Sequence, residues 1–340
     1  MLATPRVSVL LPVRDARPFL GDCLATLAAQ SLAEFEIVAV DDGSSDGSGE
    51  LLAAAARRDS RLRLLSQPRR GLVEALNRGL GACRAPYVAR LDADDLAARR
   101  RLELQAAALD ADPAVGVVSC RVRHFPSSAV GLGFRIYERW LNGLLSHDEI
   151  VRERFIESPI PHPSVMARRS VLEAAQGYRD RGWPEDYDLW LRLAAAGVRF
   201  AKLPRCLVGW RCHPGRLTHT DRRYAVERFL ACKAHHLARG PLAGRQPIVW
   251  GAGQTGRRLA KHLEREGAAP EAFIDIDPKK IGGSLRRRPV LAADELPRLL
   301  AGLDRPLVVT AVSSRGARRL IRARLGSWGL AEGLDFWCAA

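Results

Sequence analysis

Three carboxylates stand directly after a largely apolar segment near residue 90. The segment Val88–Leu91 has the pattern of a buried strand, and Asp92, Asp94 and Asp95 follow it. Open α/β folds bind ligands at the carboxyl ends of their strands, and hard divalent cations prefer oxygen donors. Without a cation, these neighbouring negative charges would repel one another. The spacing therefore predicts a divalent metal site at the end of this strand.

A second apolar segment also ends in carboxylates. Residues 35–40 have the pattern of a buried strand and lead into Asp41 and Asp42, which a turn rich in glycine and serine follows. Ser48 is expected to cap the helix that begins near Glu50. Two acidic strand ends are therefore expected in the same part of the fold.

These strand ends belong to a regular alternation of β-type and helical segments. Strands are predicted near 7–13, 36–40, 62–65, 87–91 and 115–120, with helices near 18–29, 49–58, 72–83 and 97–108. This rhythm is typical of βαβ units and a mostly parallel sheet, whose right-handed crossovers bring the acidic loops to one edge. The stretch 124–163 is irregular apart from a short helix near 148–156, and it suits a specificity loop or a plain connector.

Several short motifs resemble those of the family 2 glycosyltransferases, which have the GT-A fold and invert configuration during transfer. The motifs are Val7–Ala16, Gln30–Leu32, Asp41–Ser44, Leu91–Asp95, His162–Ser164, Gly177–Tyr178, Glu185–Trp190 and Trp210–Pro214. They keep the family's order over roughly the first two thirds of the chain. The resemblance implies a metal-dependent enzyme that takes a sugar from a nucleoside diphosphate, UDP being the commonest in the family. The acceptor would be a hydroxyl of a glycan or a lipid-linked molecule in cell-surface polysaccharide or glycoconjugate assembly.

The resemblance also implies roles for individual side chains. Asp94 and His213 are expected at a Mn or Mg ion, and Asp186 is expected to take the proton of the acceptor hydroxyl. The candidates on the nucleotide-sugar side are Pro12, Val13, Arg14, Asp41, Asp42, Asn77, Asp92 and Arg211. Those on the acceptor side are His162, Trp183 and Glu185. Other roles stay open: Asp41 as a turn residue, His213 as a loop residue, Asp95 as a helix cap, and Glu185 or Asp188 as the base.

A glycine motif opens a second region of the chain. After the linker-like residues 240–244, the strand 247–250 runs into Gly251, Gly253 and Gly256, and a strand about 20 residues on ends near Asp275. We expect two domains: a GT-A domain over 1–240 and a small Rossmann-like α/β domain over 245–340. The second resembles the module at the start of sugar acyltransferases, which implies a bound nucleotide or nucleotide sugar, regulation or assembly, and no hydride chemistry.

Two other functional classes fit parts of the sequence. One is an NAD-dependent sugar-modifying enzyme centred on the glycine motif. The other is a scaffold that binds nucleotide sugars without catalysis. The intact set Asp41, Asp92, Asp94, Asp186 and His213 argues against the scaffold.

Composition limits the setting of the protein. The 340 residues carry a net charge of +15 and seven scattered cysteines, without the paired spacing of zinc or redox sites. We expect reduced thiols and a cytoplasmic location, with peripheral contact at the inner face of the membrane, because no segment reaches the roughly 18 apolar residues of a membrane span. No basic patch interleaved with aromatic residues points to nucleic acid, and the oligomeric state stays open.

Overall fold

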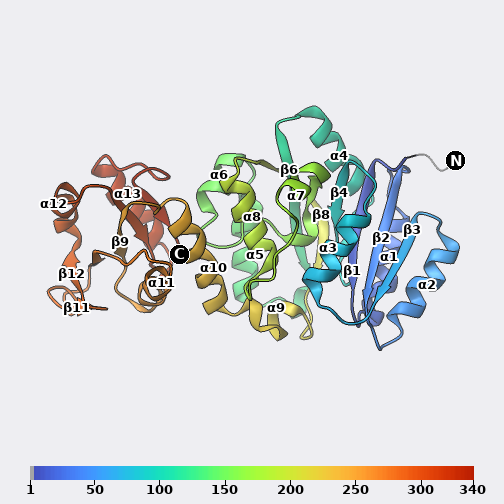
Figure 1. The fold of residues 1–340 in the computed structure, drawn as a ribbon, viewed down its shortest axis with the longest axis horizontal. Helices are drawn as coiled ribbons and strands as arrows, with labels where there is room; N and C mark the ends of the chain where they lie inside the picture. The colour runs from blue at the N-terminus through green and yellow to red at the C-terminus, as the bar shows by residue number, and fades with distance from the viewer. Residues whose placement is uncertain (1–3) are drawn as a thin grey trace. The chain divides into compact units, whose positions relative to one another are not determined.

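The computed structural model describes residues 4–340, and its contacts divide the chain into two compact units. The first comprises the chain up to Ile150, Pro159–Arg181 and Asp188–Thr220, and the second comprises Val151–Ser158, Gly182–Tyr187 and Asp221–Ala340. Figure 1 shows the elements of each unit along the chain. Helix α10 (Val226–Arg239) belongs by its contacts to the second unit. The predicted domains 1–240 and 245–340 stay a prediction.

The first unit is built on a mixed sheet. In sheet order its strands are β3 (Leu62–Gln67), β2 (Phe35–Asp42), β1 (Val7–Val13), β4 (Tyr87–Arg90), β7 (Met166–Arg168), β6 (Val115–Phe125), β8 (Arg199–Arg211) and β5 (Leu96–Ala97). Strands β3, β2, β1 and β4 are parallel to one another, as the βαβ rhythm predicted. Strand β7 is antiparallel to both neighbours, β6 and β8 are parallel, and β5 is antiparallel to β8.

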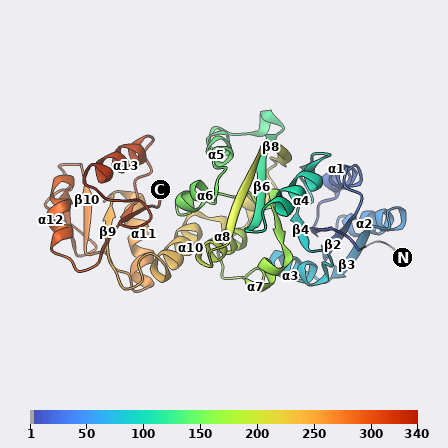
Figure 2. The same cartoon turned by 90° about the horizontal axis from the view of Figure 1, so that it is seen from above.

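Helices cover both faces of this sheet. The helices along this part of the chain are α1 (Arg17–Ala28), α2 (Ser48–Arg58), α3 (Leu72–Ala82), α4 (Arg101–Ala111), α5 (Leu132–Gly143), α6 (His147–Glu153), α7 (Arg169–Ala174), α8 (Glu185–Ala195) and α9 (Leu217–Thr220). Figure 2 shows α1 and α4 on one face and α3 and α7 on the other. Alternate residues of β1 make the two contacts: Val9 and Leu11 join Leu20 and Leu102 in one core, whereas Leu10 faces α3.

One expected helix start and one expected helix cap are wrong, and both errors have tertiary causes. The helix predicted near 97 begins at Arg101, because Leu96 and Ala97 pair with β8 and are extended. Asp95 therefore caps no helix. Ser48 lies inside α2, and its hydroxyl accepts a hydrogen bond from the backbone N–H of Ala16 instead of capping the helix.

The second unit repeats the α/β pattern on a smaller scale. In sheet order its strands are β11 (Ser284–Leu285), β12 (Arg288–Ala292), β10 (Ala272–Asp275), β9 (Gln246–Trp250), β13 (Pro306–Thr310) and β14 (Phe336–Cys338). All neighbours are parallel except β11 and β12. The helices α11 (Gln254–Arg265), α12 (Leu296–Ala301) and α13 (Ala317–Ser327) accompany α10. In the part of the chain that the structure describes, every helix is too short or too polar to cross a bilayer.

Candidate active site

The topology of the first sheet places the two acidic strand ends at one edge. Strand β1 pairs in parallel with β2 on one side and with β4 on the other, so all three carboxyl ends point the same way. The chain goes outward from β1 to β3 and then returns to the other side of β1 as β4. Such a reversal opens a crevice at the strand ends, where α/β sheets bind ligands.

Three carboxylates converge beyond the end of β4. Single oxygen atoms of Asp92, Asp94 and Asp95 lie within 4.8 Å of one another. An Arg90 nitrogen lies 2.5 Å from Asp92 Oδ1, whereas Asp95 Oδ2 is buried without a hydrogen-bond donor among the described residues. Burial raises the pKa of Asp95 well above its usual range, and the charges of Asp94 and Asp92 raise it further. This cluster of oxygen donors suits a hard divalent cation, which would offset the repulsion.

The end of β8 closes the other side of this cluster. His213 Nε2 lies 2.8 Å from Asp94 Oδ2, and the His213 ring packs on Phe19 with centroids 4.5 Å apart. Arg211 donates its backbone N–H to Asp95 Oδ1 at 2.8 Å and its side-chain Nε–H to the Asp94 carbonyl oxygen at 2.7 Å. Its guanidinium also reaches Asp22. Five residues from two distant segments thus lie together, and their role in binding a metal stays a prediction.

The end of β1 and the end of β2 form the expected nucleoside side. Pro12 and Val13 are buried, and Arg14 donates to the backbone carbonyl of Asp42 at 2.8 Å. Asp41 accepts the N–H of Ser44 at 3.0 Å. Asp42 accepts hydrogen bonds from Gln67 and from the backbone of Arg70 and Gly71, at 2.7 and 2.8 Å for the two backbone donors. Asp42 therefore shapes the turn before α3, while contact with a nucleotide stays a prediction.

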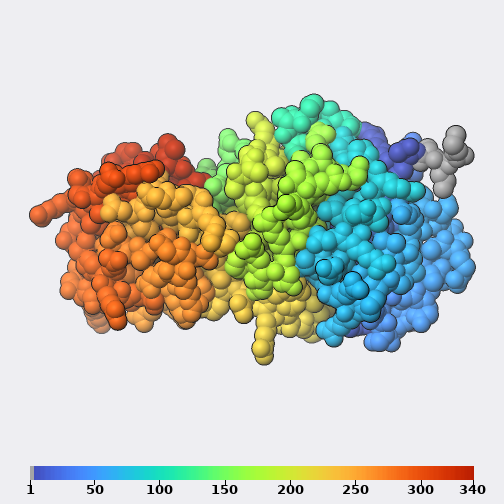
Figure 3. Space-filling model, in the orientation of Figure 1, coloured from blue at the N-terminus to red at the C-terminus, as the bar shows by residue number. Residues whose placement is uncertain are grey.

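Asn77 of α3 fastens a neighbouring loop. Its amide donates to the carbonyl oxygen of Tyr178 and accepts the N–H of the same residue, both at 2.9 Å. Gly177 has φ +62°, and a Cβ there would lie 2.5 Å from the Asn77 oxygen, so this position favours glycine. Figure 3 shows cyan surface beside yellow-green surface in this part of the chain, where α3 and the segment 169–181 adjoin. A direct contact of Asn77 with the donor stays a prediction.

The candidate base lies at the first turn of α8, whose start groups with the second unit. Glu185 is 1% exposed, and both of its carboxylate oxygens accept from the hydroxyl of Tyr224, at 3.0 and 2.9 Å. Arg223 lies 4.0 Å from the same carboxylate. Asp186 is half-buried and accepts the N–H of Tyr187 at 2.7 Å. The two adjacent carboxylates thus differ in exposure: Glu185 is enclosed, and Asp186 is more accessible.

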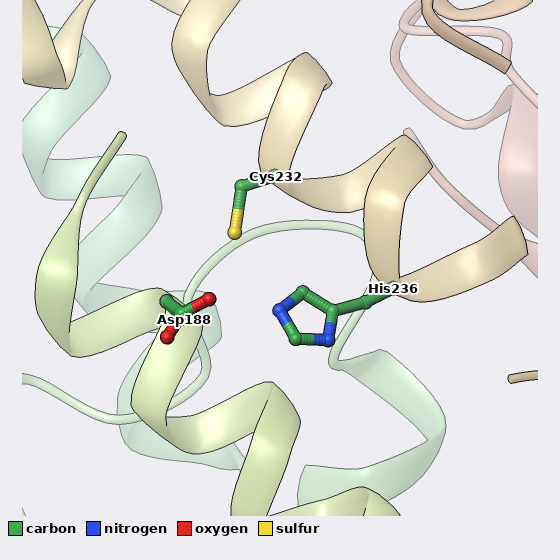
Figure 4. A group of neighbouring side chains, drawn as sticks. All are labelled: Asp188, Cys232 and His236. Carbon is green, nitrogen blue, oxygen red and sulfur yellow. The ribbon is translucent and has the colours of Figure 1, made fainter. Parts of the chain in front are cut away.

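The alternative base Asp188 is enclosed as well. Figure 4 draws it on α8, and its carboxylate accepts from Arg192 at 2.7 Å while the residue is 1% exposed. The same figure draws Cys232 and His236, which lie one turn apart on α10 of the second unit. Enclosure and pairing with arginine make Asp188 a poorer base than Asp186.

The other acceptor-side candidates are aromatic residues in packed surroundings. His162 is buried, and its Nε2 lies 2.9 Å from the hydroxyl of Tyr178, with Trp190 at 5.9 Å between ring centroids. Burial lowers the pKa of His162 well below its usual range, and the charge of Arg90 adds to this effect. Trp183 packs against His235 within the second unit. Contact of either residue with an acceptor stays a prediction.

The glycine motif of the second unit is a tight loop between β9 and α11. Gly251 has φ +126°, and a Cβ on Gly256 would lie 1.8 Å from the Gly251 carbonyl oxygen, so both positions require glycine. Around Gly253 no atom lies within 4 Å of such a Cβ. Asp275 accepts the N–H groups of Ala252, Ile276 and Asp277, at 2.8, 2.9 and 2.9 Å. The loop is therefore stabilised by the protein itself, and its predicted nucleotide stays a prediction.

Sequence reasoning missed two kinds of residue in these sites. Arg90 stands in the sequence only as part of a strand, yet it pairs with Asp92, and a charged residue in an apolar strand before acidic residues was a usable signal. Tyr224 is 39 residues from Glu185 in the chain and had no local signal.

Comparisons with known proteins agree with the family resemblance. The family model described as Glycosyl transferase family 2 matches residues 8–175. The amylovoran biosynthesis glycosyltransferase AmsE of Erwinia amylovora is 33% identical over 192 residues, which cover 56% of this chain and 69% of AmsE. The uncharacterized glycosyltransferase EpsJ of Bacillus subtilis is 40% identical over 91 residues, and this match spans only 26% of EpsJ.

Solved structures share the fold at low sequence identity. TarS of S. aureus in complex with UDP-GlcNAc superposes with a TM-score of 0.56 at 16% identity, covering 78% of this chain and 74% of that one. The mannosyltransferase PcManGT of Pyrobaculum calidifontis, in complex with GDP-Man and Mn²⁺, gives 0.53 at 23% identity, covering 78% and 66%.

Proposed function

The chain belongs to glycosyl transferase family 2, and on this premise we propose that it moves a sugar from a nucleoside diphosphate sugar to a hydroxyl. The acceptor is a glycan or a lipid-linked molecule, and the setting is the assembly of cell-surface polysaccharides or glycoconjugates. Structures of like fold that hold UDP-GlcNAc or GDP-Man support the donor class, and we choose UDP as the nucleotide. The free thiols of the seven cysteines support a reducing, cytoplasmic setting.

The observation that carries the proposal is the carboxylate cluster beyond β4. Its oxygen atoms lie close enough to share one cation, and Asp95 has a buried oxygen without a donor among the described residues. We propose Asp94 and His213 as ligands, with Asp92 beside the ribose or the metal. A Mn or Mg ion held there would offset the negative charge of the departing diphosphate.

The protein's own residues perform the remaining tasks. Asp41, with Pro12 and Val13, would hold the base and ribose at the ends of β1 and β2, and the guanidinium of Arg211 would pair with phosphate oxygens. Asp186 would accept the proton of the acceptor hydroxyl while the oxygen of that hydroxyl forms a bond to the anomeric carbon. The bond from that carbon to the diphosphate breaks on the opposite side, and its electron pair leaves with the diphosphate. In-line displacement of this kind inverts the anomeric configuration.

Ligand-dependent thermal unfolding of the full chain tests this function directly. UDP, GDP, dTDP, CDP and NAD are compared with and without Mn²⁺. One nucleoside diphosphate should stabilise the protein only when Mn²⁺ is present, by about 2.7 kcal/mol at a concentration of 100 times its Kd. Asp94→Asn should remove the stabilisation that depends on Mn²⁺. Stabilisation by NAD alone would overturn the proposal and move catalysis to the glycine motif.

The role of Asp186 needs a kinetic test. Asp186→Asn should lower kcat by roughly 100- to 10,000-fold and leave nucleotide binding unchanged, because a general base acts on the acceptor and not on the donor. Asp188→Asn is the matched control, because it makes the same substitution at an enclosed carboxylate of the same helix. If the control lost as much turnover at unchanged stability, Asp186 would not be the base.

A further inference from the structure

The outer face of α5 carries apolar and basic side chains together. Leu132, Arg135, Ile136 and Arg139 follow the i, i+3, i+4, i+7 spacing of a single helix face. Leu132 is 65% exposed and Ile136 is 44% exposed, and both arginines are exposed. This stripe, which we call the outer stripe of α5, contains no acidic residue. Two apolar side chains and two arginines therefore share one face of this helix.

The opposite face fastens the helix to the sheet. Leu141 and Trp140 pack in a cluster with residues of β6 and β8. Asn142 exchanges two hydrogen bonds with the backbone of β6, at 2.8 and 2.9 Å, and Glu138 accepts the backbone N–H of His124 at 2.7 Å. On the outer stripe, Arg135 donates to the carbonyl oxygens of Val130 and Ser127 at 3.1 and 3.2 Å, while Leu132, Ile136 and Arg139 are exposed.

The helix begins at the edge of the sheet that holds the carboxylate cluster. Strand β6 ends at Phe125, which pairs with Arg211, and the Phe125 carbonyl oxygen accepts the N–H of Cys212 at 2.7 Å. Phe134, in the first turn of α5, contacts the rings of His124 and His219, each 5.5 Å away between centroids. The first turn of α5 thus lies at the same end of the sheet as the carboxylate cluster.

We propose that the outer stripe of α5 docks on an anionic lipid surface. Leucine and isoleucine can enter the boundary between headgroups and acyl chains, while arginines on the same face pair with lipid phosphates. An isologous contact with a second copy would bring like-charged arginines together across the twofold axis, which disfavours it. An acidic polymer would use the arginines and leave the apolar side chains without a role. This docking is separate from sugar transfer, and its test measures binding alone.

Flotation of the full chain with vesicles tests the proposal. Vesicles with about 30% phosphatidylglycerol in phosphatidylcholine are compared with pure phosphatidylcholine, at low and high salt, since surface attraction is screened within a Debye length. The protein should float with the anionic vesicles, and less so at high salt. Arg139→Glu reverses one charge and should weaken partitioning about 25-fold. The double variant Leu132→Gln with Ile136→Gln should also weaken it, by at least tenfold.

Matched controls separate this surface from the general basic charge. Arg319→Glu with Leu320→Gln changes the same residue types on the exposed face of α13, where Leu320 is 66% exposed, and should leave partitioning unchanged. Unchanged thermal unfolding of the α5 variants shows that the helix still packs. Equal loss in the control, or anionic vesicles bound equally well by the α5 variants, would overturn the proposal. So would concentration-dependent self-association that the α5 variants abolish while vesicles stay unbound.

Discussion

In each of the two sheets, the first strand lies between two parallel neighbours. The sheets differ in the residues that follow the later of these neighbours, β4 in one and β13 in the other. Strand β1 lies between β2 and β4, and β9 lies between β10 and β13. In each sheet the second strand ends in an aspartate whose carboxylate accepts backbone N–H groups of a neighbouring loop: Asp42 with Arg70 and Gly71, and Asp275 with Ala252. The same path of the chain thus creates the same crevice twice.

The difference lies beyond β4 and β13. Strand β4 leads into three carboxylates, whereas β13 leads into alanine, valine and two serines. Burial raises the pKa of Asp275, but the N–H groups of Asp277 and Ala252 outweigh it and leave the pKa lowered, so this charge is already stabilised. The pKa of Asp95 is raised by burial and by its acidic neighbours, so that charge still needs a partner. A shared topology supplies a place for a ligand, and the strand-end residues decide its chemistry.

Removing a carboxylate from the first crevice should have the largest effect. Asp94→Asn should lower kcat/KM by roughly 100- to 1,000-fold, because it removes a proposed ligand of the metal ion that would stabilise the leaving diphosphate. Asp277→Asn beside the second crevice is the control and should change turnover less than twofold. Steady-state kinetics with saturating Mn²⁺ measure both. Equal losses would mean that both crevices take part in the same reaction.

A methyl group in the glycine loop should break the second crevice. Gly256→Ala places its Cβ against the Gly251 carbonyl oxygen, which cannot move without disturbing the loop, and should cost about 3 kcal/mol or more of unfolding free energy. Gly253→Ala meets nothing within 4 Å and should cost about 1 kcal/mol or less, as a helix N-cap change. Denaturant unfolding measures both. Loss of a nucleotide by the stable Gly253 variant would show that the second crevice also binds ligand.

Each unit contains a tyrosine whose hydroxyl donates a hydrogen bond to a carboxylate. Burial of the carboxylate should decide how much this hydrogen bond contributes to the free energy of unfolding. Tyr224→Phe leaves the enclosed Glu185 with one donor fewer and should cost about 1 to 3 kcal/mol of unfolding free energy. Tyr87→Phe removes the donor to Asp110, whose side chain is 43% exposed, and should cost less than about 1 kcal/mol because water replaces the hydroxyl. Equal costs from denaturant unfolding would contradict this difference.

Each unit also buries a lysine. The contribution of such a lysine to the free energy of unfolding should depend on pH. Lys202 donates to the carbonyl oxygens of Leu141 and Pro159, and Lys233 donates to those of Ile156 and Ala339. Burial lowers the pKa of Lys202 to about 7. Above that pH the unfolded chain binds more protons at this residue than the folded protein does, so unfolding free energy should rise with pH.

The size of this effect can be isolated with a variant. Between pH 7 and 9 the wild type should gain up to about 1.4 kcal/mol per pH unit relative to Lys202→Met, and the two should run parallel below pH 7. Denaturant unfolding at several pH values measures the difference. A difference that stays constant from pH 6 to 9 would show that the lysine remains charged when buried.

Most local elements of the fold could be predicted from the sequence. The apolar runs that became β1 and β2 and the helical run that became α3 were placed within two residues of their bounds, because their periodicity and their burial agree. The helix predicted near 97–108 was started too early, because the pairing partner of Leu96 and Ala97 lies more than a hundred residues later. Local propensity cannot report such a partner.

The sequence by itself determined which residue types end each strand, and so it already carried the two acidic ends and the glycine loop. Only the tertiary structure decided which partners those side chains meet. Asp95 accepts the N–H of Arg211 instead of capping the following helix, Asn77 bonds the backbone of Tyr178, and Glu185 accepts a hydrogen bond from Tyr224. The physical reason is that apolar periodicity and turn residues are local features of the chain. The hydrogen bond of a buried carboxylate, in contrast, is made by whichever donor the packing of distant segments brings beside it.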